Sequence, residues 1–277
     1  MDTVVSTEWL ASRLGGEQLR IVDGSWHMPQ AKRDPKREFE GAHIPGAVFF
    51  DVDGIADTSS DLPHMLPSPA AFASAVGALG IGDSDFVVVY DSRGVVSAAR
   101  VWWTFRVFGH DNVGVLDGGL PKWQAENRSI ASGAASPTPA PFTAKFRPEL
   151  VRTVAQMRAN VEGRRDQVLD ARSRGRFAAT EPEPRAGLRG GHIPGSLNLP
   201  YDELYAKDGT LRPTADLRAA LITDGIDLMK PVVTTCGSGI TASVLALALH
   251  QSGRTDAAVY DGSWTEWGGR ADTPIES

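Results

Sequence analysis

The stretch with the clearest chemical potential begins at Cys236, which is the only cysteine in a chain of 277 residues. The loop that starts there combines two glycines with two hydroxyl side chains: Cys236, Gly237, Ser238, Gly239, Ile240 and Thr241. Glycines allow such a loop to curl with its backbone N–H groups pointing inward, and a helix that follows adds positive potential at its start. A thiol in these surroundings should ionise easily, so the sequence predicts a reactive nucleophile rather than a small buried hydrophobic residue.

The elements on either side of this loop place the cysteine at the edge of a sheet. Residues 232–235 form an apolar, β-branched run that predicts a buried parallel strand, and residues 240–250 predict a helix. The thiol then lies at the carboxyl end of a strand, where open α/β folds keep their sites.

The loop resembles the active-site loop of the rhodanese superfamily of sulfurtransferases. Within it, Cys-Gly-Ser-Gly-Ile-Thr is similar to the branch that uses 3-mercaptopyruvate, because the thiosulfate-using branch carries two basic residues where this chain has Gly237 and Ser238. The resemblance implies that Cys236 holds sulfur as a persulfide. The N–H groups from Gly237 to Thr241, with Gly239 and Ile240 between them, would hold its negative charge. Thr241 has an alternative role as a helix N-cap.

Two arginines are candidates for binding the donor. The segment 175–185 resembles the substrate loop of the mercaptopyruvate branch, in which arginines occupy the places of Arg176 and Arg185. The planar guanidinium group matches a carboxylate in bidentate fashion, which suits an α-keto acid. Without the resemblance, an arginine in a charged loop is ordinarily a solvated surface residue.

The resemblance also implies a proton relay. Ser238 would act with a histidine and an aspartate from the N-terminal half, and the matching segments point to His64 and Asp53. A hydroxyl linked to an imidazole and a carboxylate can move protons, as in hydrolase triads. Electrostatic or structural roles are the alternative for all three residues.

Blocks of the first half of the chain return in the second half in the same order. Residues 40–47 return as 189–196, 86–94 as 231–239, and 115–119 as 259–263. Asp91 occupies the position of Cys236, so the first copy should be inactive in transfer and serve as a wall of the site. His43 and His192 each lie in His-Ile-Pro-Gly, and a residue present in both copies is better explained by a structural role.

Short strands alternating with helices predict an α/β protein with two tandem rhodanese-like domains, each a parallel sheet flanked by helices. Residues 1–130 should form the inactive domain, the segment 131–148, rich in Ser, Ala and Pro, a linker, and 149–277 the catalytic domain. The predicted elements are helices at 7–14, 95–108, 154–161 and 214–222, a helix opened by Ser68 and Pro69, and strands at 19–23, 86–90, 113–116, 168–170 and 257–260. Trp102 and Trp103 should belong to the core.

Composition and charge limit the classes of partner that this chain can have. A net charge of -6 argues against nucleic acid, and the longest apolar run is far shorter than a membrane span. No basic and apolar leader is visible at the N-terminus, and a free thiol suits a reducing compartment, so we expect a cytoplasmic protein. The spacing of His, Cys, Asp and Glu predicts no metal site, and no cofactor is expected. The expected partners are a small-molecule sulfur donor and an external thiol or cyanide acceptor, with thioredoxin as one candidate.

Three other functions compete with this interpretation. A cysteine phosphatase needs an arginine six residues after its cysteine, and this chain has Ala242 there. A non-enzymatic sulfur carrier or redox sensor would have no use for an α-keto acid site. Thiosulfate sulfurtransferase is the nearest alternative, although a loop without two cations should bind that dianion less well.

Overall fold

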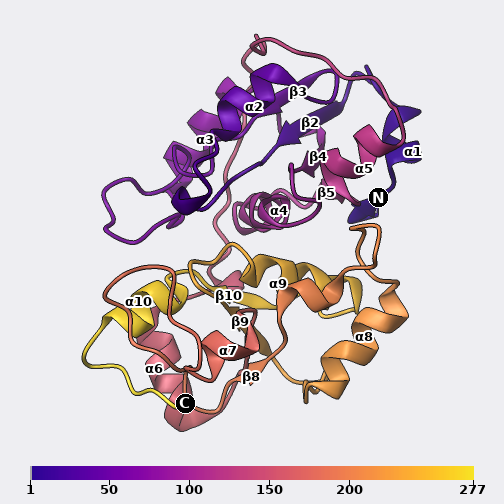
Figure 1. The fold of residues 1–277 in the computed structure, drawn as a ribbon. Coiled ribbons are helices and arrows are strands. Elements are labelled where there is room, and N and C mark those ends of the chain that lie inside the picture. Colours follow the sequence, from indigo (N-terminus) through magenta and orange to yellow (C-terminus); the bar gives the residue numbers. More distant parts are fainter. Residues whose placement is uncertain (1) are drawn as a thin grey trace. The chain divides into compact units, whose positions relative to one another are not determined.

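The computed structural model describes residues 2–277, which form two units (Figure 1). The first unit comprises the residues up to Thr58, Leu66–Phe146 and Ala206–Leu211, and the second comprises Ser59–Met65, Arg147–Tyr205 and Arg212–Ser277. Each unit is α/β and contains one five-stranded parallel sheet, which confirms the predicted fold class. The domain limits and the linker at 131–148 stay a prediction.

The first sheet has the strand order β1-β5-β4-β2-β3. Its strands are β1 (Val4–Val5), β2 (Leu19–Asp23), β3 (Ala47–Phe49), β4 (Phe86–Tyr90) and β5 (Val113–Leu116). The helices of this unit are α1 (Thr7–Ala11), α2 (Pro35–Gly41), α3 (Pro69–Ala78), α4 (Ser97–Val107) and α5 (Gly119–Ala125), with a 3-10 turn at Pro29–Ala31. The central strand β4 is buried along its whole length because it is covered on both faces, as in other parallel sheets.

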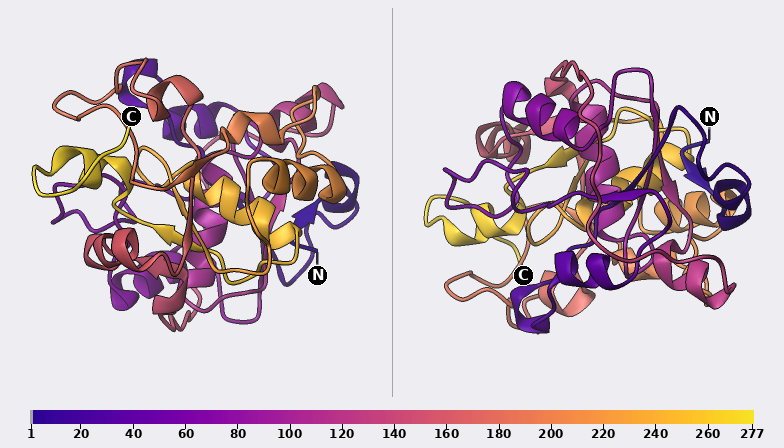
Figure 2. Two further views of the ribbon diagram at one scale, coloured as in Figure 1. Left: turned by 90° about the horizontal axis from the view of Figure 1, so that it is seen from below. Right: turned by 90° about the horizontal axis from the view of Figure 1, so that it is seen from above.

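The second sheet repeats this order as β6-β10-β9-β7-β8. Its strands are β6 (Val151–Arg152), β7 (Gln167–Asp170), β8 (Leu197–Asn198), β9 (Val232–Thr235) and β10 (Ala258–Tyr260). The helices of this unit are α6 (Val154–Gly163), α7 (Arg174–Phe177), α8 (Thr214–Thr223), α9 (Ala242–Gln251) and α10 (Ser263–Gly269), with 3-10 turns at Pro148–Leu150 and Tyr201–Leu204. The equal strand order in both units supports the duplication predicted from the sequence, and two further views show the same elements (Figure 2).

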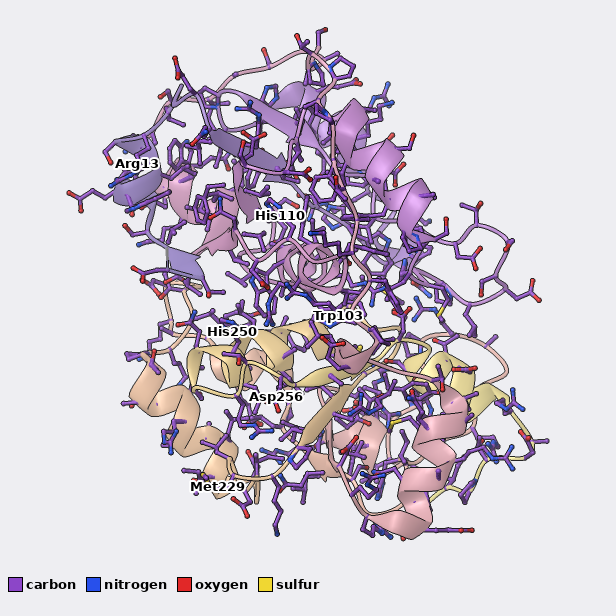
Figure 3. All side chains as sticks on the ribbon, turned by 180° about the vertical axis from the view of Figure 1, so that it is seen from behind. Arg13, Trp103, His110, Met229, His250 and Asp256 are labelled. Carbon is purple, nitrogen blue, oxygen red and sulfur yellow. The ribbon has the colours of Figure 1, made fainter. Side chains whose placement is uncertain are left out.

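The predicted helices occur, with differences at their ends. The cap prediction for α3 is confirmed, because the Ser68 side chain accepts a hydrogen bond from the Ala71 N–H. In contrast, α9 begins at Ala242 rather than at residue 240, since the loop before it is irregular and Gly239 has a φ of 81°. Trp102 and Trp103 of α4 are buried, as predicted for the core, whereas Met229 is 86% exposed. Figure 3 labels Trp103 and Met229 among the side chains.

Strand β2 ends at Asp23, a carboxyl group buried at the edge of the first sheet. Asp23 is 2% exposed, and its Oδ1 accepts a hydrogen bond from the Ser25 N–H at 2.8 Å. Burial raises the pKa of Asp23 from its usual 3.8 to about 6, although hydrogen bonds from Ser25 and Tyr90 act in the opposite direction. The ionised carboxylate therefore lowers the stability of the folded chain.

The substitution Asp23→Asn should increase stability more at neutral than at acidic pH. Folded Asp23 holds its proton more tightly than unfolded Asp23, so the wild type loses stability as the pH rises from 3.8 to about 6. Asparagine does not titrate, and the difference in free energy of unfolding between variant and wild type should grow by about 3 kcal/mol over this interval. Urea unfolding at about pH 4 and about pH 7.5 measures this difference. A difference that is independent of pH would contradict the buried charge.

Candidate active site

Cys236 directly follows β9, the central strand of the second sheet. Cys236 is a free cysteine and is 1% exposed. Its Sγ accepts a hydrogen bond from the Gly239 N–H at 3.2 Å. The loop thus directs a backbone dipole at the sulfur, where negative charge forms when the thiol ionises.

The carbonyl groups at the start of the loop point toward α10. The Cys236 carbonyl accepts a hydrogen bond from the Trp264 N–H at 2.9 Å, and the Gly237 carbonyl accepts from the Thr265 N–H at 2.9 Å and its hydroxyl at 2.6 Å. The Cys236 N–H donates to the Ser263 hydroxyl at 3.2 Å, which donates in turn to the Tyr260 carbonyl at 2.8 Å. These bonds fix the backbone that carries the thiol.

Both predicted donor-binding arginines lie beside the loop. A Cβ atom built on Gly237 would lie 3.1 Å from Nη2 of Arg176 and 3.8 Å from Nη1 of Arg185. The structure therefore brings two guanidinium groups to the residue that follows Cys236. Glycine at this position leaves the space that Arg176 needs.

A buried ion network holds Arg176 in place. Its Nη2 lies 2.6 Å from Oε2 of Glu183, and the other carboxylate oxygen of Glu183 lies 2.8 Å from Nη1 of Arg172. Arg172 is 1% exposed, pairs with Asp170 at 2.6 Å, and lies over the ring of Trp264 at 4.2 Å. Burial opposes the charge of Arg172, but the carboxylates of Asp170 and Glu183 outweigh it and raise its pKa. Glu183 is thus oriented by Arg172 and orients Arg176.

Replacement of Arg172 by alanine should strongly destabilise the second unit. It would leave Asp170 as a buried carboxylate without its cation and Glu183 paired with Arg176 alone, and an unpaired buried charge typically costs about 3–5 kcal/mol. Arg158→Ala is a suitable control, because it removes an exposed ion pair with Asp272 and should cost at most about 1 kcal/mol. Urea unfolding followed by tryptophan fluorescence measures both variants. Equal losses of stability would show that the network does not hold this unit together.

The two residues predicted to lie upstream in the proton relay belong to different units. Asp53 lies in the first unit, where its Oδ2 accepts a hydrogen bond from Trp26 Nε1 at 2.9 Å. His64 belongs to the second unit, is buried and has a φ of 60°. A histidine in this left-handed region is uncommon, and such backbone strain is often found at functional sites. The relay from Asp53 through His64 to Ser238 stays a prediction.

The remaining predicted residues lie within the cysteine loop itself. Ser238 and Ile240 are buried. Thr241 directly precedes α9, but its side chain makes no capping hydrogen bond there. The structure therefore gives no support to the alternative role of Thr241 as a side-chain N-cap.

Comparisons with known proteins agree with this geometry. The rhodanese-like domain family matches residues 6–126 and 153–270. The chain belongs to the rhodanese family. A mitochondrial thiosulfate/3-mercaptopyruvate sulfurtransferase of Arabidopsis thaliana is 46% identical over 297 residues, which cover 100% of this chain and 78% of the relative.

Two further relatives are similar to this chain over nearly its whole length. The 3-mercaptopyruvate sulfurtransferase of Homo sapiens is 45% identical over 274 residues, which cover 97% of this chain and 92% of the human protein. The crystal structure of the 3-mercaptopyruvate sulfurtransferase SseA from Escherichia coli superposes with a TM-score of 0.87 at 38% identity, covering 95% of this chain and 99% of SseA. The similarity therefore extends over both rhodanese domains.

The first rhodanese domain contains the same loop with a carboxylate in place of the thiol. The buried side chain of Asp91 accepts hydrogen bonds from the N–H groups of Arg93 at 2.7 Å, Val96 at 2.6 Å and Ala98 at 2.8 Å. The side-chain oxygens of Asp91 thus accept hydrogen bonds from the N–H groups that point into this loop. In the second rhodanese domain the Gly239 N–H donates to the sulfur at the equivalent place, which suits this loop to hold an anion.

The two histidines of the repeated His-Ile-Pro-Gly turn have matching surroundings. His43 stacks on Phe39 with ring centroids 4.2 Å apart, and its Nδ1 donates to the Phe39 carbonyl at 2.7 Å. His192 stacks on Phe177 at 3.8 Å, and its Nδ1 donates to the Phe177 carbonyl at 2.9 Å. These contacts support the structural role predicted for both histidines in the rhodanese domains.

Neither a metal site nor a membrane span is found in the described part of the chain. Among residues 2–277, no group of three or more His, Cys, Asp and Glu side chains could hold a metal ion. Over the same residues, no helix combines the length and the apolar character that crossing a membrane requires.

Five residues that hold Arg176 and the cysteine loop in place were not predicted from the sequence: Asp170, Arg172, Glu183, Ser263 and Thr265. Two sequence features could have indicated Asp170 and Ser263. Asp170 ends a predicted strand, and Ser263 follows Asp261 and Gly262 in a block that both halves share. The pairing of Arg172 with Glu183 could not be seen, because it depends on how the segment 174–190 folds back over the sheet.

Proposed function

We propose that this protein transfers the sulfur of 3-mercaptopyruvate to an external acceptor through Cys236 and releases pyruvate. The observation that carries the proposal is the position of the two arginines, because Arg176 and Arg185 both lie beside Gly237. A donor that presents a carboxylate and a neighbouring carbonyl next to its sulfur fits this arrangement. The names of the relatives include both this donor and thiosulfate.

The first step is an attack of the Cys236 thiolate on the sulfur of 3-mercaptopyruvate. A new S–S bond forms, and the bond between that sulfur and the methylene carbon breaks, with its electron pair passing to the carbon. The fragment leaves as the enolate of pyruvate. It takes up one proton, which balances the thiol proton of the donor, so that the products are pyruvate and a persulfide anion on Cys236.

Two groups of residues support charge and proton movement in this step. The Gly239 N–H donates to Sγ, and it would stabilise the persulfide anion together with the other N–H groups predicted to surround it, from Gly237 to Thr241. Ser238, His64 and Asp53 would carry the proton to the enolate, in the manner of a hydroxyl, imidazole and carboxylate relay. Arg176 and Arg185 would hold the carboxylate and carbonyl of the donor.

The second step requires an acceptor from outside the chain. With one cysteine, the protein has no second thiol that could resolve the persulfide. A small thiol, cyanide or a thiol protein such as thioredoxin can attack the outer sulfur and take it, which regenerates the Cys236 thiolate. A cytoplasmic location is part of this proposal, since both the free thiol and reduced acceptors are maintained in a reducing compartment.

The experiment that tests the proposed donor compares kcat/KM for 3-mercaptopyruvate and thiosulfate with one acceptor and one enzyme preparation. A strong preference for 3-mercaptopyruvate is expected, because Gly237 and Ser238 supply no cation for the second charge of thiosulfate. A preference for thiosulfate would keep the role of Cys236 but overturn the donor. Activity with neither donor would favour a sulfur carrier or redox sensor.

A further inference from the structure

The first unit contains a cavity of about 330 Å³ at the carboxyl edge of its sheet. Its walls include Asp23, Ser25, Arg33, Glu38, Phe39 and Leu120. The volume is at the lower end of the range for small-molecule sites, which is about 300–1,000 Å³. The duplicated fold allows this space to be compared, residue by residue, with its counterpart in the second unit.

Ser25 takes the place of the buried arginine of the second unit. Asp23 ends β2 in register with Tyr90, and Asp170 ends β7 in register with Thr235. Each aspartate accepts a hydrogen bond from the N–H two residues further on, at 2.8 Å from Ser25 and at 2.9 Å from Arg172. The short Ser25 side chain therefore stands where Arg172 fills the second unit.

Leu120 takes the place of the aromatic ring beneath that arginine. The Leu120 N–H donates to the Asp91 carbonyl at 3.0 Å, and the Trp264 N–H donates to the Cys236 carbonyl at 2.9 Å. Trp264 supports the guanidinium group of Arg172, which lies over its ring. In the first unit, the smaller residues Ser25 and Leu120 thus replace Arg172 and Trp264. Both of them line the cavity.

A third pair of equivalent residues, Glu38 in the first unit and Arg176 in the second, has opposite charges. Phe39 and Phe177 are equivalent because each stacks on the histidine of the repeated turn. The residue before Phe177 is Arg176, and the residue before Phe39 is Glu38. A position that places a cation beside Gly237 in the second unit carries a carboxylate in the first.

The negative charge of Asp23 lacks the cation that its counterpart has. Asp170 receives a guanidinium group, with its Oδ2 2.6 Å from Nη2 of Arg172. Asp23 instead receives hydrogen bonds from neutral donors alone, the N–H and hydroxyl of Ser25 and the Tyr90 hydroxyl. Glu38, the other acid of the cavity, is already paired with Arg33 at 2.6 Å.

We propose that this cavity binds a small organic cation with a guanidinium or alkylammonium group, for which the Asp23 carboxylate is the counter-ion. The pair of Asp170 and Arg172 shows how such a group fits against this part of the fold, with two nitrogens facing one carboxylate. Phe39 and Leu120 provide apolar walls for the rest of the ligand. The site is separate from the cysteine loop and does not depend on the donor proposed above.

The test is a titration of the full ¹⁵N-labelled chain with methylguanidinium in phosphate buffer, since Tris is itself an organic cation. Saturable shifts of amide signals near Ser25, Phe39 and Leu120 are expected, with a dissociation constant of about 1–10 mM for so small a ligand. N-Methylurea has nearly the same shape without the charge and should not bind. Equal binding of methylurea, or no saturable shifts with methylguanidinium, would overturn the proposal.

Two variants locate the binding to this cavity. Asp23→Asn should weaken methylguanidinium at least about tenfold. Ser25→Arg should abolish binding without unfolding the chain, because it supplies the guanidinium group in the way that Arg172 does. The control is Glu17→Gln, which removes an exposed acid of the same unit and should leave the affinity unchanged. Wild-type affinity in either cavity variant would refute the assignment.

Discussion

Replacing Cys236 by serine should abolish sulfur transfer from 3-mercaptopyruvate, with a loss of at least about 10³-fold in kcat. The chain has no other thiol, and a serine hydroxyl neither ionises near neutral pH nor forms a persulfide. The hydroxyl can still accept the hydrogen bond that the Gly239 N–H donates to Sγ. The variant should therefore keep the loop and lose the chemistry.

The control for this prediction is the stability of the same variant. Because Cys236 is buried and serine is close to it in size, the midpoint of urea unfolding should change little while activity disappears. Loss of activity together with unfolding would say nothing about the nucleophile, and Cys236→Ala then serves as the second variant. Turnover that persists in a folded variant, with either donor, would exclude Cys236 as the nucleophile.

Among substitutions that act on activity, Arg185→Ala has the second largest expected effect. Loss of one charge-assisted hydrogen bond to the donor carboxylate typically costs about 1.5–3 kcal/mol. We therefore expect KM for 3-mercaptopyruvate to rise by about 10- to 100-fold, with a smaller change for thiosulfate, which has no carboxylate. Steady-state kinetics with both donors and one acceptor measures the difference.

Arg174 provides a matched control in the same segment. It pairs with Glu203 at 2.9 Å and is exposed, whereas Arg176 and Arg185 lie beside Gly237. Arg174→Ala should leave KM for both donors within about twofold of the wild type. An equal increase of KM for the two donors in Arg185→Ala, or an increase of similar size in Arg174→Ala, would remove Arg185 from the carboxylate site.

The parts of the fold that could be predicted are those whose signal is local. The unit of β9, the cysteine loop and α9 follows from a β-branched run, two glycines and an apolar helix. The duplication is visible because short blocks such as His-Ile-Pro-Gly recur in order. Each of these features is contained in a few neighbouring residues.

The edge strands could not be predicted from the sequence. Strands β1, β6 and β8 have two residues each, which is too short for an alternating pattern to appear. They become strands because their backbone pairs with a neighbour that is distant in the sequence, as Val4 pairs with Val115. The same limit applies to α7, a helix of four residues.

The support of the candidate site was missed for a related reason. Arg172 lies in a charged segment, where arginine is normally solvated, yet it is buried between Asp170 and Glu183. Only the folded chain shows that these carboxylates face it and that Trp264 lies beneath it. The network also shows why a second glutamate matters in the Glu-Pro-Glu-Pro segment, since Glu183 joins the buried arginine to Arg176.

The most direct measurement of the central claim is the intact mass of the protein after exposure to 3-mercaptopyruvate without an acceptor. We expect a gain of one sulfur atom per chain, located by peptide mapping at Cys236, together with one equivalent of pyruvate. The added sulfur should be absent from Cys236→Ser and should disappear from the wild type when a thiol acceptor is supplied. Turnover of 3-mercaptopyruvate to pyruvate with no sulfur on Cys236 would contradict the account.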